Sequence, residues 1–490
     1  MRPWVLAAGL AAALVGVIGE FRSPVNGDVA YMLDAAGRML GGERLYADLI
    51  DLNPPFMFWL SEPAAALADG AGAVAAFRMM VLALAAAMLV LAWPVSRGQP
   101  GLRAGYVLIA FMLPLGHFGE REHVIFCLVF PYVALAVHRA CGLRVSTGLA
   151  VGIGVAAGAG MALKPPAALL ALALAAISWR RMERDGRRLH PEHLAVTGVL
   201  AAGFMLVLVF APAYLRAIAE YGALYAEFSR GTLLGTMFGH LYGIFTFAAL
   251  VLAGLTAVSV GRRSTAAVLA AAAMALYGAA IVQAKGFSYH YLPAYGFAVM
   301  LAIELMTAGG NARVALTALR RIAAAVLLLA MLAPPLAVAM DRARGAAVDP
   351  LPGREALANV LKADAPGNTF AMLSVRLGDA YPLVLYHRFE YVLSVPSLWF
   401  ADLEDGDGAA SSLWRRVARE IGARAPAVIV ARAPDPAQAG PGDLDFDYVA
   451  RLCATPGGPE ALRDYGLATR VAGYAVYRRD FSGAQPCASS

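Results

Sequence analysis

The chain has 490 residues, of which 60% are hydrophobic and only 15% are charged, and its mean hydropathy is +0.63. A water-soluble protein carries about 25% charged residues, so this composition excludes a soluble globular protein and predicts one that is embedded in lipid. The net charge of +6 comes mostly from arginines in short loops. That distribution is typical of membrane orientation and indicates no nucleic-acid partner.

Eleven apolar segments follow one another along the first 340 residues, and each predicts a helix that crosses the bilayer. The first segment, residues 4–18, has no small-x-small cleavage site after it, so we expect an uncleaved anchor. The other ten are residues 73–95, 104–118, 123–137, 145–163, 165–179, 194–215, 241–260, 265–284, 289–305 and 322–340.

The orientation of these helices is predicted from the arginines in alternate loops, which belong on the cytoplasmic side. These are Arg97, Arg103, Arg139, Arg144, Arg180, Arg181, Arg184, Arg187, Arg188, Arg262, Arg263, Arg313, Arg320 and Arg321. We therefore expect a multi-pass protein of a bacterial inner membrane, with a transmembrane domain over residues 1–340 and a periplasmic domain over residues 341–490. The loop of residues 20–72 and the turns at 119–122, 164 and 285–288 then share the outer face. Polar groups at membrane depth usually line a functional cavity.

The outer loop and the tail have secondary-structure patterns of their own. Residues 29–40 place apolar residues at helical spacing, which predicts an interfacial helix with Asp28 as its N-cap. In the tail, helical patterns at 354–363 and 412–423 alternate with β-rich runs at 370–375, 427–431 and 474–478, which predicts a small soluble α/β domain. The two cysteines of the tail, Cys453 and Cys487, could pair, although their spacing does not require it.

Two clusters contain the candidate acids and bases. Asp28 follows the first span and is placed to deprotonate an acceptor hydroxyl at the membrane surface, with helix capping as the alternative. Glu120, Arg121, Glu122 and His123 are compressed between two apolar spans, where Arg121 could bind a phosphate and His123 could orient a carboxylate or join a metal. The alternative is a surface turn with compensating ion pairs.

Two further turns supply cations on the predicted outer face. Lys164 stands between two apolar runs, before the helix-breaking Pro165-Pro166, and either binds a phosphate or snorkels to the interface. Lys285, Tyr289 and His290 lie in an aromatic turn that precedes a span, where tyrosines also serve as interface residues.

The first outer loop resembles that of the C-type (GT-C) glycosyltransferases, in the branch that contains the protein O-mannosyltransferases and the lipid A aminoarabinose transferase. The similar residues are Asp28, Gly42-Glu43-Arg44-Leu45-Tyr46 and Pro54-Pro55-Phe56-Met57-Phe58-Trp59-Leu60. The resemblance implies a GT-C-like helical fold, a catalytic Asp28 and a second acidic residue at Glu120 or Glu122. Many members have Lys-Pro-Pro where this chain has Asn53-Pro54-Pro55, and their lysine lies near the donor phosphate, so other cations must bind that phosphate here.

The same resemblance implies a reaction, namely transfer of a sugar from a polyprenyl-phosphate donor to an acceptor hydroxyl, with inversion at the sugar. Asp28 would be the base, Arg121, Lys164 and Lys285 would hold the phosphate, and Tyr289 and His290 would flank the donor. The acceptor, whether a glycan, a lipid or a protein, stays open, and so does a divalent cation at Asp28, Glu120 or Glu122 with His123. The alternatives are a transporter or scaffold without enzymatic activity and an oligosaccharide ligase or polymerase.

Overall fold

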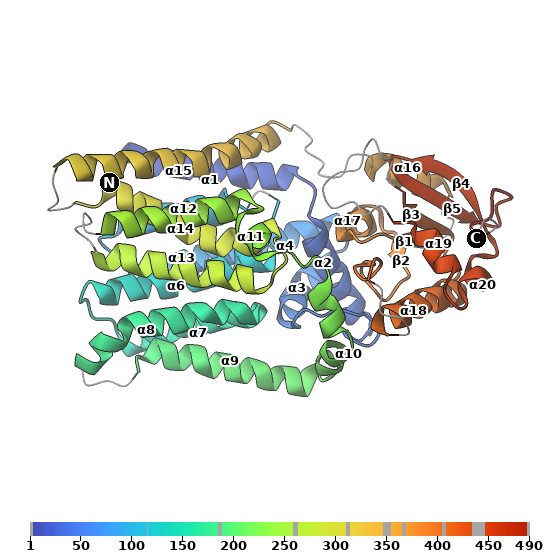
Figure 1. The fold of residues 1–490 in the computed structure, drawn as a ribbon, viewed down its shortest axis with the longest axis horizontal. Helices are drawn as coiled ribbons and strands as arrows, with labels where there is room; N and C mark the ends of the chain where they lie inside the picture. Colours follow the sequence, from blue (N-terminus) through green and yellow to red (C-terminus); the bar gives the residue numbers. More distant parts are fainter. Residues whose placement is uncertain are drawn as a thin grey trace. The chain divides into compact units, whose positions relative to one another are not determined.

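The computed structural model describes residues 3–114, 116–184, 189–257, 263–309, 314–345, 354–364, 369–403, 408–433 and 446–487 (Figure 1). Of the arginines that predict the orientation, those at 187, 188, 262 and 313 lie outside these ranges. Contacts divide the chain into two compact units. Unit 1 contains Met1–Ser23, Arg78–Phe210 and Ser229–Val348, and unit 2 contains Pro24–Phe77, Ala211–Phe228 and Asp349–Ser490. The predicted domain boundary at residue 341 stays a prediction.

Unit 1 is helical, and each of the eleven predicted apolar segments overlaps one of its helices. The helices are α1 (Pro3–Arg22), α4 (Ala71–Ala92, here from Arg78), α5 (Pro100–Phe111), α6 (Arg121–Ala140), α7 (Thr147–Leu163), η1 (Pro165–Ala168), α8 (Leu169–Arg184), α9 (Pro191–Phe210), α11 (Leu233–Phe238), α12 (Leu241–Thr256), α13 (Arg263–Val282), η3 (Ser288–Tyr291), α14 (Leu292–Thr307) and α15 (Val314–Ala343). Among the described residues, five helices are long and apolar enough to cross a membrane, namely α4, α6, α9, α13 and α15. The number of eleven crossings therefore stays a prediction.

Helices α6 and α14 form the core of unit 1. Most residues of both are buried, because α6 packs against α5, α7, α8, α13 and α14, and α14 also packs against α12 and α15. In contrast, α9 exposes large apolar side chains such as Leu194, Phe204 and Phe210. A helix that is apolar all round is typical of a bundle core, whereas exposed apolar faces suit contact with lipid.

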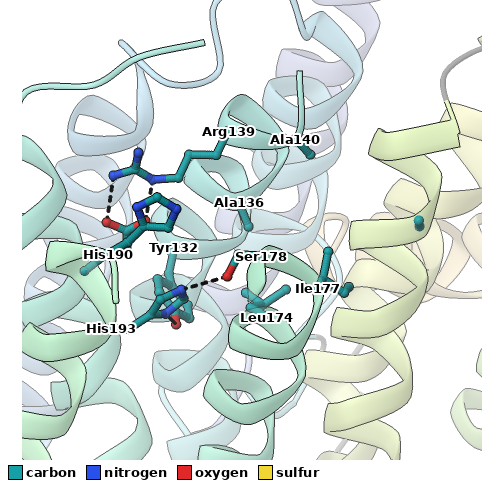
Figure 2. Close-up of a pocket in the computed structure, with 11 residues that line it drawn as sticks. Tyr132, Ala136, Arg139, Ala140, Leu174, Ile177, Ser178, His190 and His193 are labelled. Atoms are coloured by element: carbon teal, nitrogen blue, oxygen red, sulfur yellow. Dashed lines mark hydrogen bonds and ion pairs between the residues drawn. The ribbon is translucent and has the colours of Figure 1, made fainter. Parts of the chain in front are cut away.

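Small residues bring α7 close to its neighbours. A Cβ atom at Gly154 would lie 2.4 Å from the Glu192 carbonyl oxygen, and one at Gly158 would lie 2.7 Å from the Val199 Cβ. This spacing of small residues is the one that lets membrane helices approach closely. Helix α9 also joins α6 through a buried ion pair, in which the Arg139 Nη2 donates to the Glu192 Oε2 over 2.9 Å (Figure 2).

Unit 2 combines helices with a mixed sheet. Its helices are α2 (Gly27–Leu40), α3 (Phe56–Leu67), α10 (Ala213–Glu227), α16 (Arg354–Asp364), α17 (Leu377–His387), α18 (Ala409–Arg424), α19 (Tyr448–Cys453) and α20 (Gly458–Leu462). Its strands are β1 (Thr369–Leu373), β2 (Glu390–Tyr391), β3 (Val428–Arg432), β4 (Tyr465–Val471) and β5 (Tyr474–Arg479). The sheet order is β2-β1-β3-β5-β4, in which β1 pairs in parallel with β2 and β3 and the remaining pairs are antiparallel. Helix α2 packs against α3 and α17, so the first loop folds with part of the tail.

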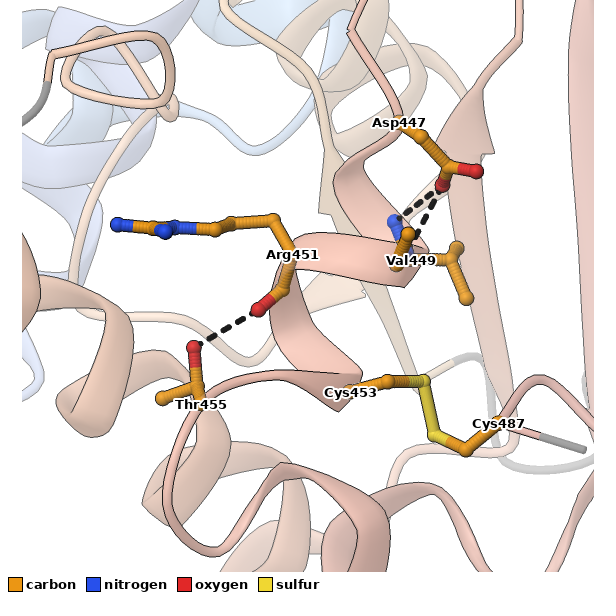
Figure 3. Close-up of a disulfide and its surroundings, with 7 residues drawn as sticks. Asp447, Val449, Arg451, Cys453, Thr455 and Cys487 are labelled. Carbon is orange, nitrogen blue, oxygen red and sulfur yellow. Dashed lines mark hydrogen bonds between the residues drawn. A yellow bond between two sulfur atoms is a disulfide. The ribbon is translucent and has the colours of Figure 1, made fainter. Parts of the chain in front are cut away.

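Three details differ from, or add to, the sequence predictions. The predicted span of residues 194–215 is too long, because α9 ends at Phe210 and a separate helix, α10, begins at Ala213. The N-cap of α2 is Asn26, whose side chain accepts a hydrogen bond from the Val29 N–H over 2.8 Å, so the prediction that Asp28 is the N-cap is wrong. The two tail cysteines, Cys453 and Cys487, form a disulfide between the end of α19 and the C-terminal segment (Figure 3).

Candidate functional site

The turn that precedes α6 carries four consecutive polar residues, and all four are buried. Gly119 has a φ of +80°, which glycine adopts readily and which turns the chain sharply, Glu120 is the N-cap residue, and Arg121, Glu122 and His123 form the first turn of α6. The exposed fractions of residues 120–123 are 4, 5, 3 and 0%. The alternative of a surface turn is therefore wrong, although Glu120 and Glu122 do form ion pairs.

Glu122 is held by a lysine from the end of α7. Pro165 and Pro166 end α7 and start the 3₁₀ turn η1, which leaves Lys164 as the C-cap residue, and its ammonium donates to the Glu122 Oε1. The His290 Nε2 lies 3.9 Å from the same oxygen. Within the described ranges, the buried Glu122 Oε2 and His290 Nδ1 have no hydrogen-bond partner. Buried polar atoms usually have a partner, so these two atoms are suited to receive a polar ligand.

A second polar chain runs beside this ion pair. The His117 Nδ1 lies 3.0 Å from the Glu120 Oε1, and its Nε2 lies 3.0 Å from the Ser288 Oγ. Tyr289 packs against both chains, since its ring centroid is 5.7 Å from that of His117 and 4.6 Å from that of His290. No sequence pattern singles out His117 or Ser288, because each becomes significant only through its partner.

The remaining predicted cations, Arg121 and Lys285, lie near Glu122 and His290. Arg121 and Lys285 are close enough to His290 to act on it electrostatically, and Arg121 acts on Glu122 in the same way. The Lys164 Nζ also lies 5.6 Å from the centre of the Tyr289 ring, within the range of a cation–π contact. The structure thus brings together Glu120, Arg121, Glu122, Lys164, Lys285, Tyr289 and His290, which we call the Glu122 cluster.

A buried group of two arginines and one glutamate was not predicted from the sequence. The Arg78 Nη2 donates to the Glu20 Oε1 and to the Ser23 carbonyl oxygen, each over 3.0 Å, and the Arg342 Nη1 lies 3.8 Å from the Glu20 Oε2. A Cβ atom at Gly116 would lie 3.2 Å from the Arg342 Nη2, so this group adjoins the turn that carries His117. The signal that could have found it is an ionisable residue within or beside each of three apolar spans.

Two predicted residues have other surroundings. The His123 ring uses both nitrogens on the backbone, with Nδ1 accepting from the Gly119 N–H over 3.1 Å and Nε2 lying 2.9 Å from the Ala110 carbonyl oxygen. This geometry leaves neither nitrogen for a metal or a carboxylate. Asp28 belongs to unit 2, where it is half-buried in the first turn of α2. The described residues contain no group of three or more His, Cys, Asp or Glu that could hold a metal ion.

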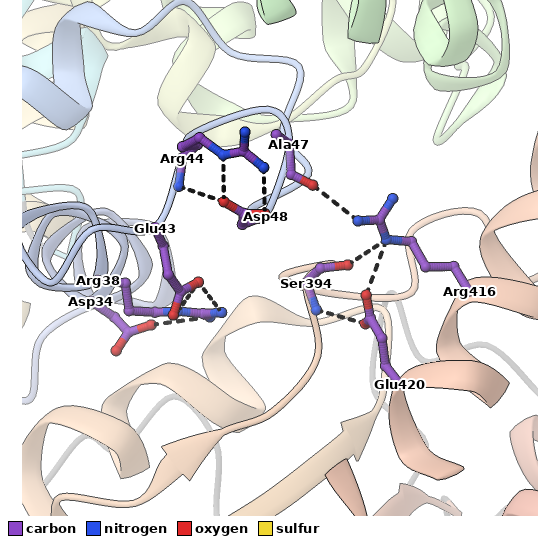
Figure 4. Close-up of polar contacts among 9 residues, drawn as sticks. All are labelled: Asp34, Arg38, Glu43, Arg44, Ala47, Asp48, Ser394, Arg416 and Glu420. Carbon is purple, nitrogen blue, oxygen red and sulfur yellow. Dashed lines mark hydrogen bonds and ion pairs between the residues drawn. The ribbon is translucent and has the colours of Figure 1, made fainter. Parts of the chain in front are cut away.

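The loop of unit 2 that contains the Asn-Pro-Pro motif is held by its own polar contacts. The Asn53 N–H donates to the Asp51 Oδ1 over 2.5 Å, and the Asn53 carbonyl oxygen accepts from the Tyr46 hydroxyl over 2.5 Å. Nearby, Arg38 donates to both carboxylate oxygens of Glu43, and the Arg416 Nη2 donates to the Ala47 carbonyl oxygen over 3.0 Å (Figure 4). These contacts stabilise the conformation of the loop.

The fold of this chain is similar to that of solved GT-C glycosyltransferase structures, so the predicted GT-C-like fold is confirmed at the level of the fold. The crystal structure of ArnT from Cupriavidus metallidurans bound to undecaprenyl phosphate matches with a TM-score of 0.57 and 13% identity, covering 98% of this chain and 99% of that one. Apo ArnT from the same organism matches with a TM-score of 0.53 and 14% identity, covering 97% of each chain. No protein-family model matches the sequence, and neither does any curated protein.

Proposed function

We propose that this chain is a membrane glycosyltransferase that moves a sugar from a polyprenyl-phosphate donor to an acceptor hydroxyl on the extracytoplasmic face. The observation that carries the proposal is the fold match over the whole chain to an enzyme bound to undecaprenyl phosphate. The Glu122 cluster supports it, because it gathers three cations around buried groups at one end of the bundle.

The proposed reaction is a single displacement. The acceptor oxygen attacks the anomeric carbon while the bond from that carbon to the phosphate oxygen breaks, so the sugar is inverted and polyprenyl phosphate leaves with the electron pair. Asp28 takes the proton of the acceptor hydroxyl, as expected of a carboxylate positioned as a general base. The phosphate is already a weak base, so no acid has to protonate it.

The phosphate is bound by other cations here, because this chain has Asn53 where many GT-C enzymes have a lysine. Arg121 offers a planar fork of donors, whereas Lys164 and Lys285 offer point charges. In the structure, the Lys164 ammonium donates to the Glu122 carboxylate. A phosphate would therefore compete with Glu122 for this ammonium, and the unpartnered Glu122 Oε2 and His290 Nδ1 would face the polar part of the donor.

The test uses the full chain purified and reconstituted in liposomes with a panel of synthetic polyprenyl-phosphate sugars. We expect release of polyprenyl phosphate that depends on an added acceptor, and a product whose anomeric configuration is opposite to that of the donor. The Asp28→Asn variant should be inactive, while Asp69→Asn, an exposed carboxylate of the same unit, serves as the matched control. No release with any donor, or movement of the intact lipid across the bilayer without cleavage, would favour the transporter instead.

A further inference from the structure

A serine, a histidine and a glutamate form a hydrogen-bonded chain that the proposed sugar transfer does not use. The Ser288 Oγ lies 3.0 Å from the His117 Nε2, and the His117 Nδ1 lies 3.0 Å from the Glu120 Oε1. Both distances are those of hydrogen bonds. The order of the three groups, a hydroxyl, an imidazole and a carboxylate, is that of a catalytic triad.

The turn before α6 holds the histidine and the glutamate together. The His117 N–H donates to the Pro114 carbonyl oxygen over 2.7 Å, and the Glu120 N–H donates to the His117 carbonyl oxygen over 3.1 Å. Gly119, with its φ of +80°, completes this tight turn. Ser288 comes from η3, 171 residues later in the chain than His117, so only the fold brings the three side chains together.

The carboxylate determines which nitrogen of His117 carries the proton. An ionised carboxylate only accepts hydrogen bonds, so the Nδ1 that faces Glu120 must carry a hydrogen. In the neutral ring the Nε2 is then an acceptor, and it accepts the hydrogen bond of the Ser288 hydroxyl. The histidine is thus placed to remove the proton of Ser288, which makes the serine a nucleophile.

The exposure of the three side chains follows the same order. The Glu120 and His117 side chains are 5% and 25% exposed, and Ser288 is half-buried. The acid is therefore shielded from water, whereas the serine is open to a substrate. Phe287 and Tyr289, on either side of Ser288 in the chain, stack with ring centroids 5.6 Å apart. These rings suit an apolar group beside the serine.

Another serine–histidine pair in unit 1 has a phenol in place of the acid. The Ser178 Oγ lies 3.1 Å from the His193 Nε2 (Figure 2), but it also donates to the Ala175 carbonyl oxygen over 3.0 Å. The His193 Nδ1 lies 2.5 Å from the Tyr132 hydroxyl, which can donate as well as accept. This phenol does not fix the proton on Nδ1. Ser178, half-buried like Ser288, is therefore an internal control.

We infer that Ser288, His117 and Glu120 form a second active site, which hydrolyses carboxylic esters. The Ser288 Oγ attacks the carbonyl carbon while the His117 Nε2 takes its proton. The C–O bond of the ester breaks, the alcohol leaves with the proton from His117, and an acyl-serine remains. Water then attacks the acyl-serine and gives a proton to His117, which returns it to the Ser288 Oγ as the carboxylic acid leaves. Glu120 orients the imidazole and stabilises its charged form.

The first test is covalent labelling of the full chain, purified in a mild detergent, with an alkyl fluorophosphonate. The Ser288 Oγ displaces fluoride from phosphorus, and peptide mass spectrometry locates the adduct. We expect a label on Ser288 and none on Ser178. His117→Asn and Glu120→Gln should each lower the labelling rate by about 100-fold or more. Ser178→Ala should be labelled as fast as the wild type.

The second test is hydrolysis of p-nitrophenyl acetate and p-nitrophenyl octanoate. The wild type should hydrolyse these esters faster than Ser288→Ala does. Faster cleavage of the octanoate indicates a lipid ester as the substrate, and faster cleavage of the acetate indicates an acetylated glycan. Neither test contains a polyprenyl-phosphate donor, so a failure of the proposed sugar transfer and a failure of this second activity are distinguishable.

Three results would overturn the proposal. The first is a wild type without a label on Ser288, and the second is equally fast labelling in His117→Asn and Glu120→Gln. The third is ester hydrolysis that Ser288→Ala leaves unchanged. Each variant is checked for an unchanged unfolding midpoint. Glu120→Gln, which keeps the size of the side chain, carries the test alone if His117→Asn does not fold.

Discussion

The ion pair between Lys164 and Glu122 can be tested for stability and for function with the same variants. The two side chains are 14% and 3% exposed. Lys164→Met removes the ammonium and leaves the Glu122 carboxylate buried, with the His290 Nε2 at 3.9 Å and the charge of Arg121 still acting on it. Breaking a buried pair from one side costs ~3 to 5 kcal/mol, whereas replacing both partners with apolar residues is often neutral. The double variant Lys164→Met/Glu122→Leu should therefore regain most of the lost stability.

The assay is unfolding of the purified protein in a mild detergent, followed in wild type, both single variants and the double variant. Lys362→Met, an exposed lysine of α16, is the control and should change stability by less than about 0.5 kcal/mol. Donor binding is then measured in the double variant, which should bind a polyprenyl-phosphate sugar at least about ten times more weakly. A Lys164→Met variant as stable as the wild type would refute the buried pair. A folded double variant with full donor affinity would refute the role of Lys164 at the phosphate.

Three further predictions concern unit 2. Asp28→Asn should leave the protein folded and lower transfer by about two to four orders of magnitude, the range for a positioned base; wild-type turnover would exclude that role. Burial raises the pKa of the Asp34 carboxyl to about 6 from its ordinary value of 3.8, against the opposing effect of Arg38. Since the folded state then binds the proton more tightly than the unfolded state, stability falls as pH rises from about 4 to 6, and Asp34→Asn should remove up to about 3 kcal/mol of this loss; an unchanged pH profile of thermal unfolding would contradict it. Replacing Cys453 and Cys487 by serine opens a loop with a sequence separation of 34 and should lower the free energy of unfolding in denaturant by ~3 to 4 kcal/mol. Equal unfolding midpoints for the variant and the wild type would contradict this prediction.

The helices of unit 1 could be predicted because their signal is local. Each apolar run overlaps a helix, and the Pro165-Pro166 pair correctly predicts that α7 ends just before Lys164. Proline at these positions removes a backbone donor and clashes with the preceding turn. Such effects depend on neighbours in sequence, which makes them visible without a structure.

The start of α2 shows where local rules fail. Asn26 and Asp28 are both good capping residues, so the sequence does not choose between them. The choice depends on packing, because Gly27 approaches α17 so closely that a Cβ atom would lie 2.4 Å from the Gly378 nitrogen. The partners of His117 and of Glu20 are likewise distant in sequence, and no spacing rule connects Glu20 with Arg78 and Arg342.

The glycines of α7 have a consequence for evolution and engineering of this chain. Gly160 lies one turn before Lys164, and a Cβ atom at Gly160 would lie 2.8 Å from the Leu128 Cβ on α6, the helix that carries Glu122. On the other face of α7, Gly154 and Gly158 allow the same close approach by α9. Because these glycines have no side chain, α7 packs closely against α6 and α9, and Lys164 at its end contacts Glu122 of α6. The glycines themselves take no part in the chemistry. Replacing one of these glycines by alanine would push α7 away from its neighbour and change the distance between Lys164 and Glu122, although every polar residue of the Glu122 cluster stayed unchanged.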